Sequence, residues 1–107
     1  MKYRIYRLPI AHPAKFMGTD FMMRNDGIPS KEEYVLVYVG EINETYETHI
    51  LDKIYEKLNI DHPDDYHLPS LSVSDVIMIF NGNEIDYWYV DSIGFKRIWC
   101  WRTKRMV

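Results

Sequence analysis

Serine and aspartate side chains gather in two short clusters of the sequence, and their types would suit hydroxyl nucleophile chemistry. The first cluster contains Ser72, Ser74 and Asp75, and the second contains Asp91, Ser92 and Gly94. A serine nucleophile needs a base held within hydrogen-bond distance of its hydroxyl group. None of the four histidines lies in a motif that would supply this base. We therefore interpret both clusters as turns between strands, in which a serine caps the turn and the glycine adopts a positive φ.

A second group of residues has the types that bind divalent metal ions. His62 and His67 flank a loop that also carries Asp61, Asp64 and Asp65. Imidazole and carboxylate groups are both common metal ligands, but this spacing matches no standard ligand pattern. We interpret the segment as a solvated acidic loop, and we predict no metal site, no cofactor and no catalytic residue.

Charges are distributed unevenly along the chain, although the whole protein carries a formal net charge of only -3. Residues 41–65 hold eight acidic side chains and two lysines, which is a local balance of -6. Residues 96–107 hold five basic side chains and no acidic one. A small net charge produces no basic field over the whole molecule, so the two polarised segments are the informative ones.

The acidic segment predicts a surface that binds a basic region of a protein partner. Its predicted contact residues are Glu44, Glu47, Asp52, Glu56, Asp61, Asp64, Asp65 and Tyr66. Trp88 is a further aromatic residue that would contribute to partner binding where it is exposed. The sequence leaves the oligomeric state open.

The basic segment supports an alternative function, which is binding of nucleic acid through cations and stacked aromatic rings. The candidate contact residues are Lys96, Arg97, Trp99, Trp101, Arg102, Lys104 and Arg105. Strand alternation places Trp99 and Trp101 on one face, where they would equally well belong to the core. A third hypothesis is an enzyme that uses Asp75, Asp91 or the two loop histidines.

The hydrophobic pattern predicts an α+β fold of about five mainly antiparallel strands, with one principal helix packed on one face. Residues 2–8 read as a first strand, whose three basic residues favour an edge position. The unbroken apolar run at 34–39 predicts a strand buried on both faces, and hence central in its sheet. Gly40 ends this strand. The apolar stripe at 46–58 predicts the helix, with Asn43 or Thr45 as its N-cap.

The second half of the sequence predicts three more strands. Residues 75–80 and 85–90 form a hairpin around an Asn-Gly pair, which suits a type I′ turn. Residues 91–94 turn the chain again, and 95–101 form the last strand. The single cysteine, Cys100, lies in this last strand, and we interpret it as a packed thiol in a reducing compartment.

Length and composition predict one domain over residues 1–107. Hydrophobic residues make up 47% of the chain, which is enough for an ordinary core. The N-terminus lacks the apolar segment of a signal peptide, and no apolar run approaches the length of a membrane span. We therefore expect a soluble, cytoplasmic protein that has no contact with a membrane.

The chain resembles the YodL-like family of small bacterial domains, most clearly over 57–98, KLNIDHPDDYHLPSLSVSDVIMIFNGNEIDYWYVDSIGFKRI. The most specific part of the resemblance is the pair SLSVSDV and YVDSIGF. Three segments of the first half are similar to the family as well: YRIYRL at 3–8, FMGTDFM at 16–22 and YVLVYVGEI at 34–42. The resemblance therefore covers nearly the whole chain.

What the resemblance implies is a biological setting more than a chemistry. Such domains occur in Firmicutes, on phages, conjugative elements and plasmids, and no catalytic residue can be carried over from them. It implies an anti-CRISPR or antirestriction inhibitor, or a modulator of a host process such as cell-shape control. We therefore predict a non-enzymatic protein that inhibits a bacterial host protein by occlusion, by covering a surface that the target needs.

Overall fold

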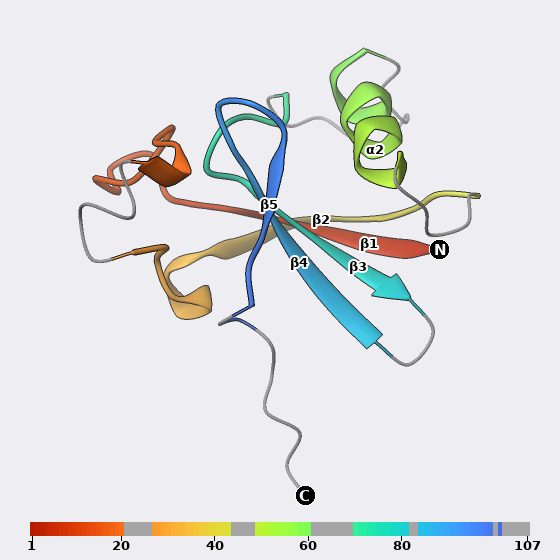
Figure 1. The fold of residues 1–107 in the computed structure, drawn as a ribbon, viewed down its shortest axis with the longest axis horizontal. Coiled ribbons are helices and arrows are strands. Elements are labelled where there is room, and N and C mark those ends of the chain that lie inside the picture. Colours follow the sequence, from red (N-terminus) through yellow and green to blue (C-terminus); the bar gives the residue numbers. More distant parts are fainter. Residues whose placement is uncertain (21–26, 44–48, 61–69, 82–83, 100, 102–107) are drawn as a thin grey trace, which may run out of the picture.

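The part of the chain that the structure describes forms one antiparallel sheet with an α-helix packed on it (Figure 1). The computed structural model describes residues 1–20, 27–43, 49–60, 70–81, 84–99 and 101. The strands are β1 Lys2–Arg7, β2 Val35–Glu41, β3 Val76–Asn81, β4 Glu84–Val90 and β5 Phe95–Arg97. The helices are the 3-10 helix η1 Lys31–Glu33 and the α-helix α2 Ile50–Asn59. This arrangement confirms the predicted α+β class.

The order of the strands in the sheet is β2-β1-β3-β4-β5, and every neighbouring pair is antiparallel. The predicted hairpin of β3 and β4 is confirmed, with Val76 opposite Tyr89 and Asn81 opposite Glu84. Its Asn-Gly turn lies outside the described residues. β5 pairs with β4 but ends at Arg97, so the last strand is shorter than the predicted 95–101.

The first strand occupies the interior of the sheet, so its predicted edge position is wrong. β1 pairs with β2 on one side and with β3 on the other. Its two arginine side chains find partners on the neighbouring structure: the Arg4 guanidinium lies 5.5 Å from the Phe80 ring centroid. Arg7 donates hydrogen bonds to the carboxylate of Asp75. The basic residues therefore do not indicate an edge strand, because long-range contacts stack one arginine on an aromatic ring and neutralise the other.

The second strand lies at the edge of the sheet, so the prediction of a central strand buried on both faces is wrong as well. Val35, Leu36 and Val39 are 53%, 44% and 55% exposed. A run of β-branched and aromatic residues has high strand propensity in either position. β2 also continues through Gly40 instead of ending there. A Cβ atom at Gly40 would lie 2.4 Å from Cζ of Tyr3, so this glycine makes room for the tyrosine ring across the strand pair.

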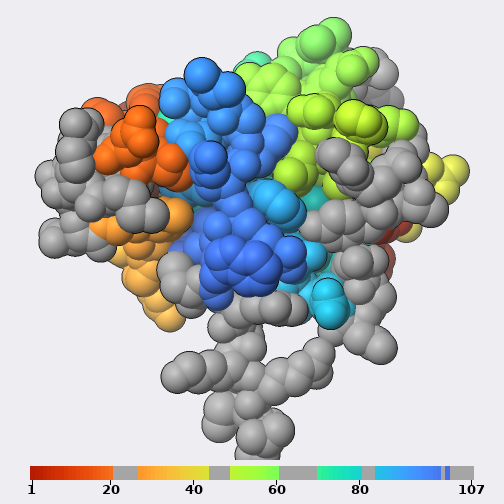
Figure 2. All heavy atoms as spheres, viewed as in Figure 1, coloured from red at the N-terminus to blue at the C-terminus, as the bar shows by residue number. Residues whose placement is uncertain are grey.

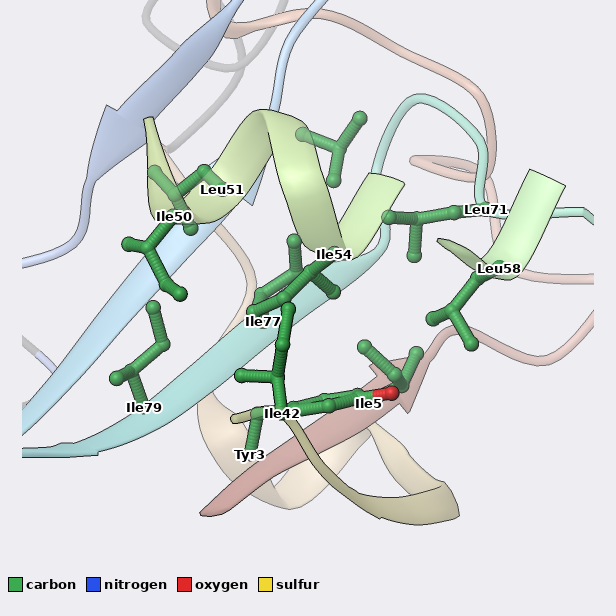
Figure 3. Close-up of a cluster of buried hydrophobic side chains, with 11 residues drawn as sticks. Tyr3, Ile5, Ile42, Ile50, Leu51, Ile54, Leu58, Leu71, Ile77 and Ile79 are labelled. Carbon is green, nitrogen blue, oxygen red and sulfur yellow. The ribbon is translucent and has the colours of Figure 1, made fainter. Parts of the chain in front are cut away.

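Helix α2 buries one apolar stripe against the sheet, as Figure 3 shows. The helix contributes Ile50, Leu51, Ile54 and Leu58, and the strands contribute Tyr3, Ile5, Ile77 and Ile79. Residues three or four positions apart share one side of a helix, so the predicted helix is confirmed from Ile50 onward. Residues 44–48 lie outside the described part of the chain. His49 is the N-cap of α2, in place of the predicted Asn43 or Thr45.

Trp101 belongs to a second core on the opposite face of the sheet. This core contains Tyr6, Leu8, Ala14, Tyr34, Val76, Met78, Tyr87, Tyr89, Ile98 and Trp101. The Trp101 ring meets those of Tyr34 and Tyr87 edge-on, with centroids 4.9 Å and 5.4 Å apart. Its Nε1 donates a hydrogen bond to the carbonyl oxygen of Pro29 at 3.0 Å. Trp101 is therefore a core residue.

Candidate functional site

Three segments that lie far apart in the sequence meet at one end of the sheet. They are residues 16–19, 72–75 and 91–94, and hydrogen bonds connect them. In Figure 1 the turn at 91–94 lies between the first of these segments and α2. The two serine and aspartate clusters of the sequence therefore belong to one region of the molecule.

The segment at 16–19 forms hydrogen bonds with both serine and aspartate clusters. The backbone N–H of Phe16 donates to Oγ of Ser74 at 3.0 Å. The backbone N–H and the hydroxyl group of Thr19 donate to the two carboxylate oxygens of Asp91. A Cβ atom at Gly18 would lie 2.8 Å from Oδ1 of Asp91. The glycine therefore permits the close approach on which these hydrogen bonds depend.

The backbone of this region is strained at two residues. Phe16 has φ 68° and Ser74 has φ 84°, a region that few residues other than glycine adopt without cost. Gly94 has φ 71°, which confirms the predicted positive φ in the turn at 91–94. The Ser72 hydroxyl donates to the carbonyl oxygen of Ser70 at 3.0 Å. The serine hydroxyls of this region thus take part in hydrogen bonds that shape the backbone.

Asp75 lies in a buried cluster of charges beneath these turns. Its side chain is fully buried, and it accepts hydrogen bonds from Nε and Nη2 of Arg7 at 3.0–3.2 Å. Nζ of Lys15 lies 4.0 Å away, and the backbone N–H of Ser72 donates to Oδ2. Burial raises the pKa of Asp75, and the hydrogen bonds and charge of Arg7 oppose that rise. This geometry gives Asp75 a structural role in joining β1 to the turn before β3.

Asp91 holds the turn at 91–94 in place as an ionised carboxylate. Burial acts to raise its pKa, but hydrogen bonds from Thr19 and from the backbone N–H of Ser92 outweigh it, helped by the charge of Lys96. The pKa of Asp91 therefore lies below its ordinary value, because these donors favour the charged form.

Replacing Thr19 by valine is expected to raise the pKa of Asp91, because the variant loses one hydrogen-bond donor to the carboxylate. A Thr19→Ser variant keeps the hydroxyl group and is the matched control. With a folded pKa below the unfolded value of about 3.9, the stabilisation by Asp91 is present above that value and is lost as the pH falls through the folded pKa. NMR titration of the Asp91 carboxyl carbon measures the shift. Equal pKa values in wild type and Thr19→Val would contradict this assignment.

An open pocket of about 260 Å³ lies where the turn at 91–94 meets α2. It is lined by Asp52, Tyr55, Val73, Val90, Asp91, Ser92, Gly94 and Phe95. Figure 2 shows this face of the molecule, where the C-terminal strands, in blue, lie beside α2, in green. Ile93, between two of the lining residues, is 88% exposed. The pocket therefore lies between the outer face of α2 and the exposed apolar side chain of Ile93 on the turn.

Two residues of the predicted acidic surface lie in the described part of the chain. Asp52 and Glu56 are both exposed on the outer face of α2. The other predicted contacts lie outside the described residues: Glu44, Glu47, Asp61, Asp64, Asp65 and Tyr66. Trp88 is partly buried and packs against the core beneath α2, so it offers less surface to a partner than the sequence analysis supposed.

The predicted nucleic-acid surface is only partly assembled. Lys96 and Trp99 are exposed, but Arg97 forms an ion pair with Asp86. The Arg97 guanidinium also lies over Trp99, 4.1 Å from the ring centroid. Because β5 ends at Arg97, strand alternation does not reach Trp99 and Trp101, and their predicted shared face is wrong. Arg102, Lys104 and Arg105 lie outside the described residues.

Sequence reasoning missed four residues that build this region. Arg7 and Lys15 supply the cations around Asp75, and Tyr55 and Phe95 supply the aromatic walls of the pocket. The sequence analysis placed Tyr55 only within the predicted helix at 46–58, and Phe95 only at the start of the predicted strand at 95–101. No local motif predicts these contacts, because each contact joins residues from distant segments.

The described residues hold no group of three or more histidine, cysteine, aspartate or glutamate side chains that would bind a metal ion. The two loop histidines of the sequence analysis, His62 and His67, lie outside those residues. Within the same part of the chain, no helix is long and apolar enough to cross a membrane.

Comparison with known proteins adds one match. The family model described as the YodL-like domain matches residues 2–100, nearly the entire chain. No curated protein and no solved structure matches significantly. The match confirms the family indicated by the motifs at 57–98, and the three segments that meet beside the pocket all lie within it.

Proposed function

This chain belongs to the YodL-like domain family, and on that premise we propose that it is a non-enzymatic inhibitor of a bacterial host protein. In this proposal the protein is encoded by a phage or another mobile element, and its target is a CRISPR or restriction effector. It acts by occlusion, because the bound domain covers a surface that the target needs.

The observation that carries the proposal is the continuity of the surface around the pocket. The outer face of α2 presents Asp52 and Glu56, and the neighbouring turn presents Ile93, which is 88% exposed. The pocket is lined by Asp52 of the helix and by Ser92 and Gly94, the two residues that flank Ile93. An apolar tip beside acidic side chains suits a basic protein surface, since charge complementarity steers association and apolar contact supplies affinity.

The surface is also rigidly supported. The turn is held by the hydrogen bonds from Thr19 to Asp91 and from Ser74 N–H to the carbonyl oxygen of Val90. The helix is anchored by its buried stripe, in which Ile54 is fully buried. A surface that is already ordered loses less conformational entropy on binding, which favours a stable inhibitory complex.

The test is an affinity pull-down with the tagged protein in lysate of a Gram-positive bacterium that carries CRISPR and restriction systems. The lysate is used with and without nuclease, and the bound proteins are identified by mass spectrometry. We expect one stoichiometric partner that survives nuclease treatment. An Asp52→Lys/Glu56→Lys variant should lose this partner, and Glu84→Lys, at the exposed start of β4, should keep it. Retention of the partner by the first variant would rule out this surface.

A second candidate function is nucleic-acid binding through the C-terminal strand. It is favoured by Trp99, which is 61% exposed and stacks on Arg97 beside the exposed Lys96. Base stacking on such a ring and phosphate contacts by cations would give binding that weakens steeply with salt. Trp99→Ala should then reduce binding to a labelled single-stranded oligonucleotide. Binding that does not depend on salt would contradict this alternative.

A further inference from the structure

We infer that the pocket between α2 and the turn at 91–94 receives a basic side chain, a guanidinium or an ammonium group, from the bound protein partner. The inference rests on the proposed function for the existence of that partner, and it assigns the chemistry by which the partner is recognised. It is drawn from the charge, the walls and the size of the pocket.

Two carboxylates from separate elements line the pocket. Asp52 comes from the first turn of α2, and its side chain is 73% exposed. Asp91 comes from the turn on the other side and is held in its ionised form by Thr19 and Ser92. Each carboxylate has one exposed basic side chain nearby. His49 Nδ1 lies 4.0 Å from Oδ2 of Asp52, and Lys96 lies near Asp91. A cationic group entering between the carboxylates is attracted by both, whereas a phosphate group is repelled.

The walls suit the remainder of a long basic side chain. The rings of Tyr55 and Phe95 meet edge-on, with centroids 6.3 Å apart and planes at 75°. Aromatic rings attract cations through their faces. Val73 and Val90 supply apolar lining, and apolar surface accommodates the methylene stem of lysine or arginine while its head stays near the carboxylates.

The size of the pocket favours a single side chain over a larger ligand. Its volume is about 260 Å³, whereas sites for drug-sized molecules and cofactors commonly span about 300–1,000 Å³. The pocket is continuous with the exposed helix face and lies beside Ile93. A partner that covers this surface would therefore be able to insert a side chain into the open side of the pocket.

The test is an NMR titration of the full chain with two uncharged-backbone peptides, acetyl-Gly-Gly-Arg-Gly-Gly-amide and its Gln counterpart. We expect the Arg peptide to produce saturable shifts at Tyr55, Val90 and Phe95, and the Gln peptide to produce none. Asp52→Asn should weaken Arg-peptide binding about two- to fivefold, the effect expected from losing one exposed charge partner. Glu84→Gln removes an exposed acidic group at the start of β4, outside both the pocket lining and the proposed partner surface, and should leave the affinity unchanged.

Three results would overturn the inference. They are equal shifts with both peptides, shifts scattered over exposed acidic residues outside the pocket, and equal weakening by Asp52→Asn and Glu84→Gln. The outcome is also separable from that of the pull-down. If the Arg peptide fails to bind while the Asp52→Lys/Glu56→Lys variant loses a nuclease-resistant partner, this inference fails and the proposed function stands. If the peptide binds but no protein partner survives nuclease, the pocket assignment stands and the proposed function fails.

Discussion

Replacing Asp75 by asparagine is expected to lower the free energy of unfolding by about 3–5 kcal/mol, the usual cost of breaking a buried ion pair. The Asp75 side chain is fully buried, and those of Arg7 and Lys15 are 11% and 9% exposed. The amide would leave both cations without a counter-charge where little water can replace it. It would also weaken the hydrogen bond that the Ser72 N–H donates to the carboxylate.

Chemical denaturation followed by tryptophan fluorescence measures this loss. The double variant Arg7→Met/Asp75→Asn should be more stable than the sum of the two single variants predicts, by about 0.5–3 kcal/mol, because the two residues interact directly. Asp52→Asn is the matched control, since its side chain is exposed and surface substitutions change stability by about 0.5 kcal/mol or less. A loss for Asp75→Asn no larger than that of the control would show that the buried ion pair is not structural.

Replacing Ile54 by alanine is expected to lower the free energy of unfolding by about 2–5 kcal/mol. Ile54 is fully buried in the centre of the contact between α2 and the sheet, where it packs with Ile5 and Ile77 (Figure 3). The shorter side chain removes apolar contact and leaves a cavity that the surrounding side chains fill only in part. Alanine is a good helix former, so the loss reports packing and not helix propensity.

Thermal and chemical unfolding of the Ile54→Ala variant test this expectation. Glu56→Ala is the matched control, because Glu56 lies on the exposed face of the same helix. We expect the control to change stability by about 0.5 kcal/mol or less. Comparable losses in both variants would mean that α2 does not depend on its buried stripe for stability.

Variants at Asp75 and Ile54 change the stability of the fold, whereas Asp52→Asn changes the charge of the pocket at an exposed position. This separation matters for the functional tests, because an unfolded variant loses every partner. Binding results with Asp52→Asn and Glu84→Gln are therefore interpretable when both variants unfold at the same temperature as the wild-type protein.

Local sequence patterns determined the secondary structure of this protein well. The two strand-like runs around the Asn-Gly pair predicted the β3–β4 hairpin, and the apolar stripe predicted α2 from Ile50 onward. The glycine of the turn at 91–94 predicted a positive φ, which Gly94 adopts. The motifs also identified the YodL-like domain family, which the family match confirms. These features depend on residues close together in the chain, so the sequence alone carries them.

Only the tertiary structure decided the sheet order and the composition of the site. β1 pairs with β3 across some 70 residues of sequence, and this pairing places β1 in the interior and leaves β2 at the edge. Arg7 meets Asp75 in the same way, and the pocket brings α2 beside the turn at 91–94. Propensity and periodicity describe neighbours in sequence, whereas these contacts depend on which distant segments bury the most apolar surface together.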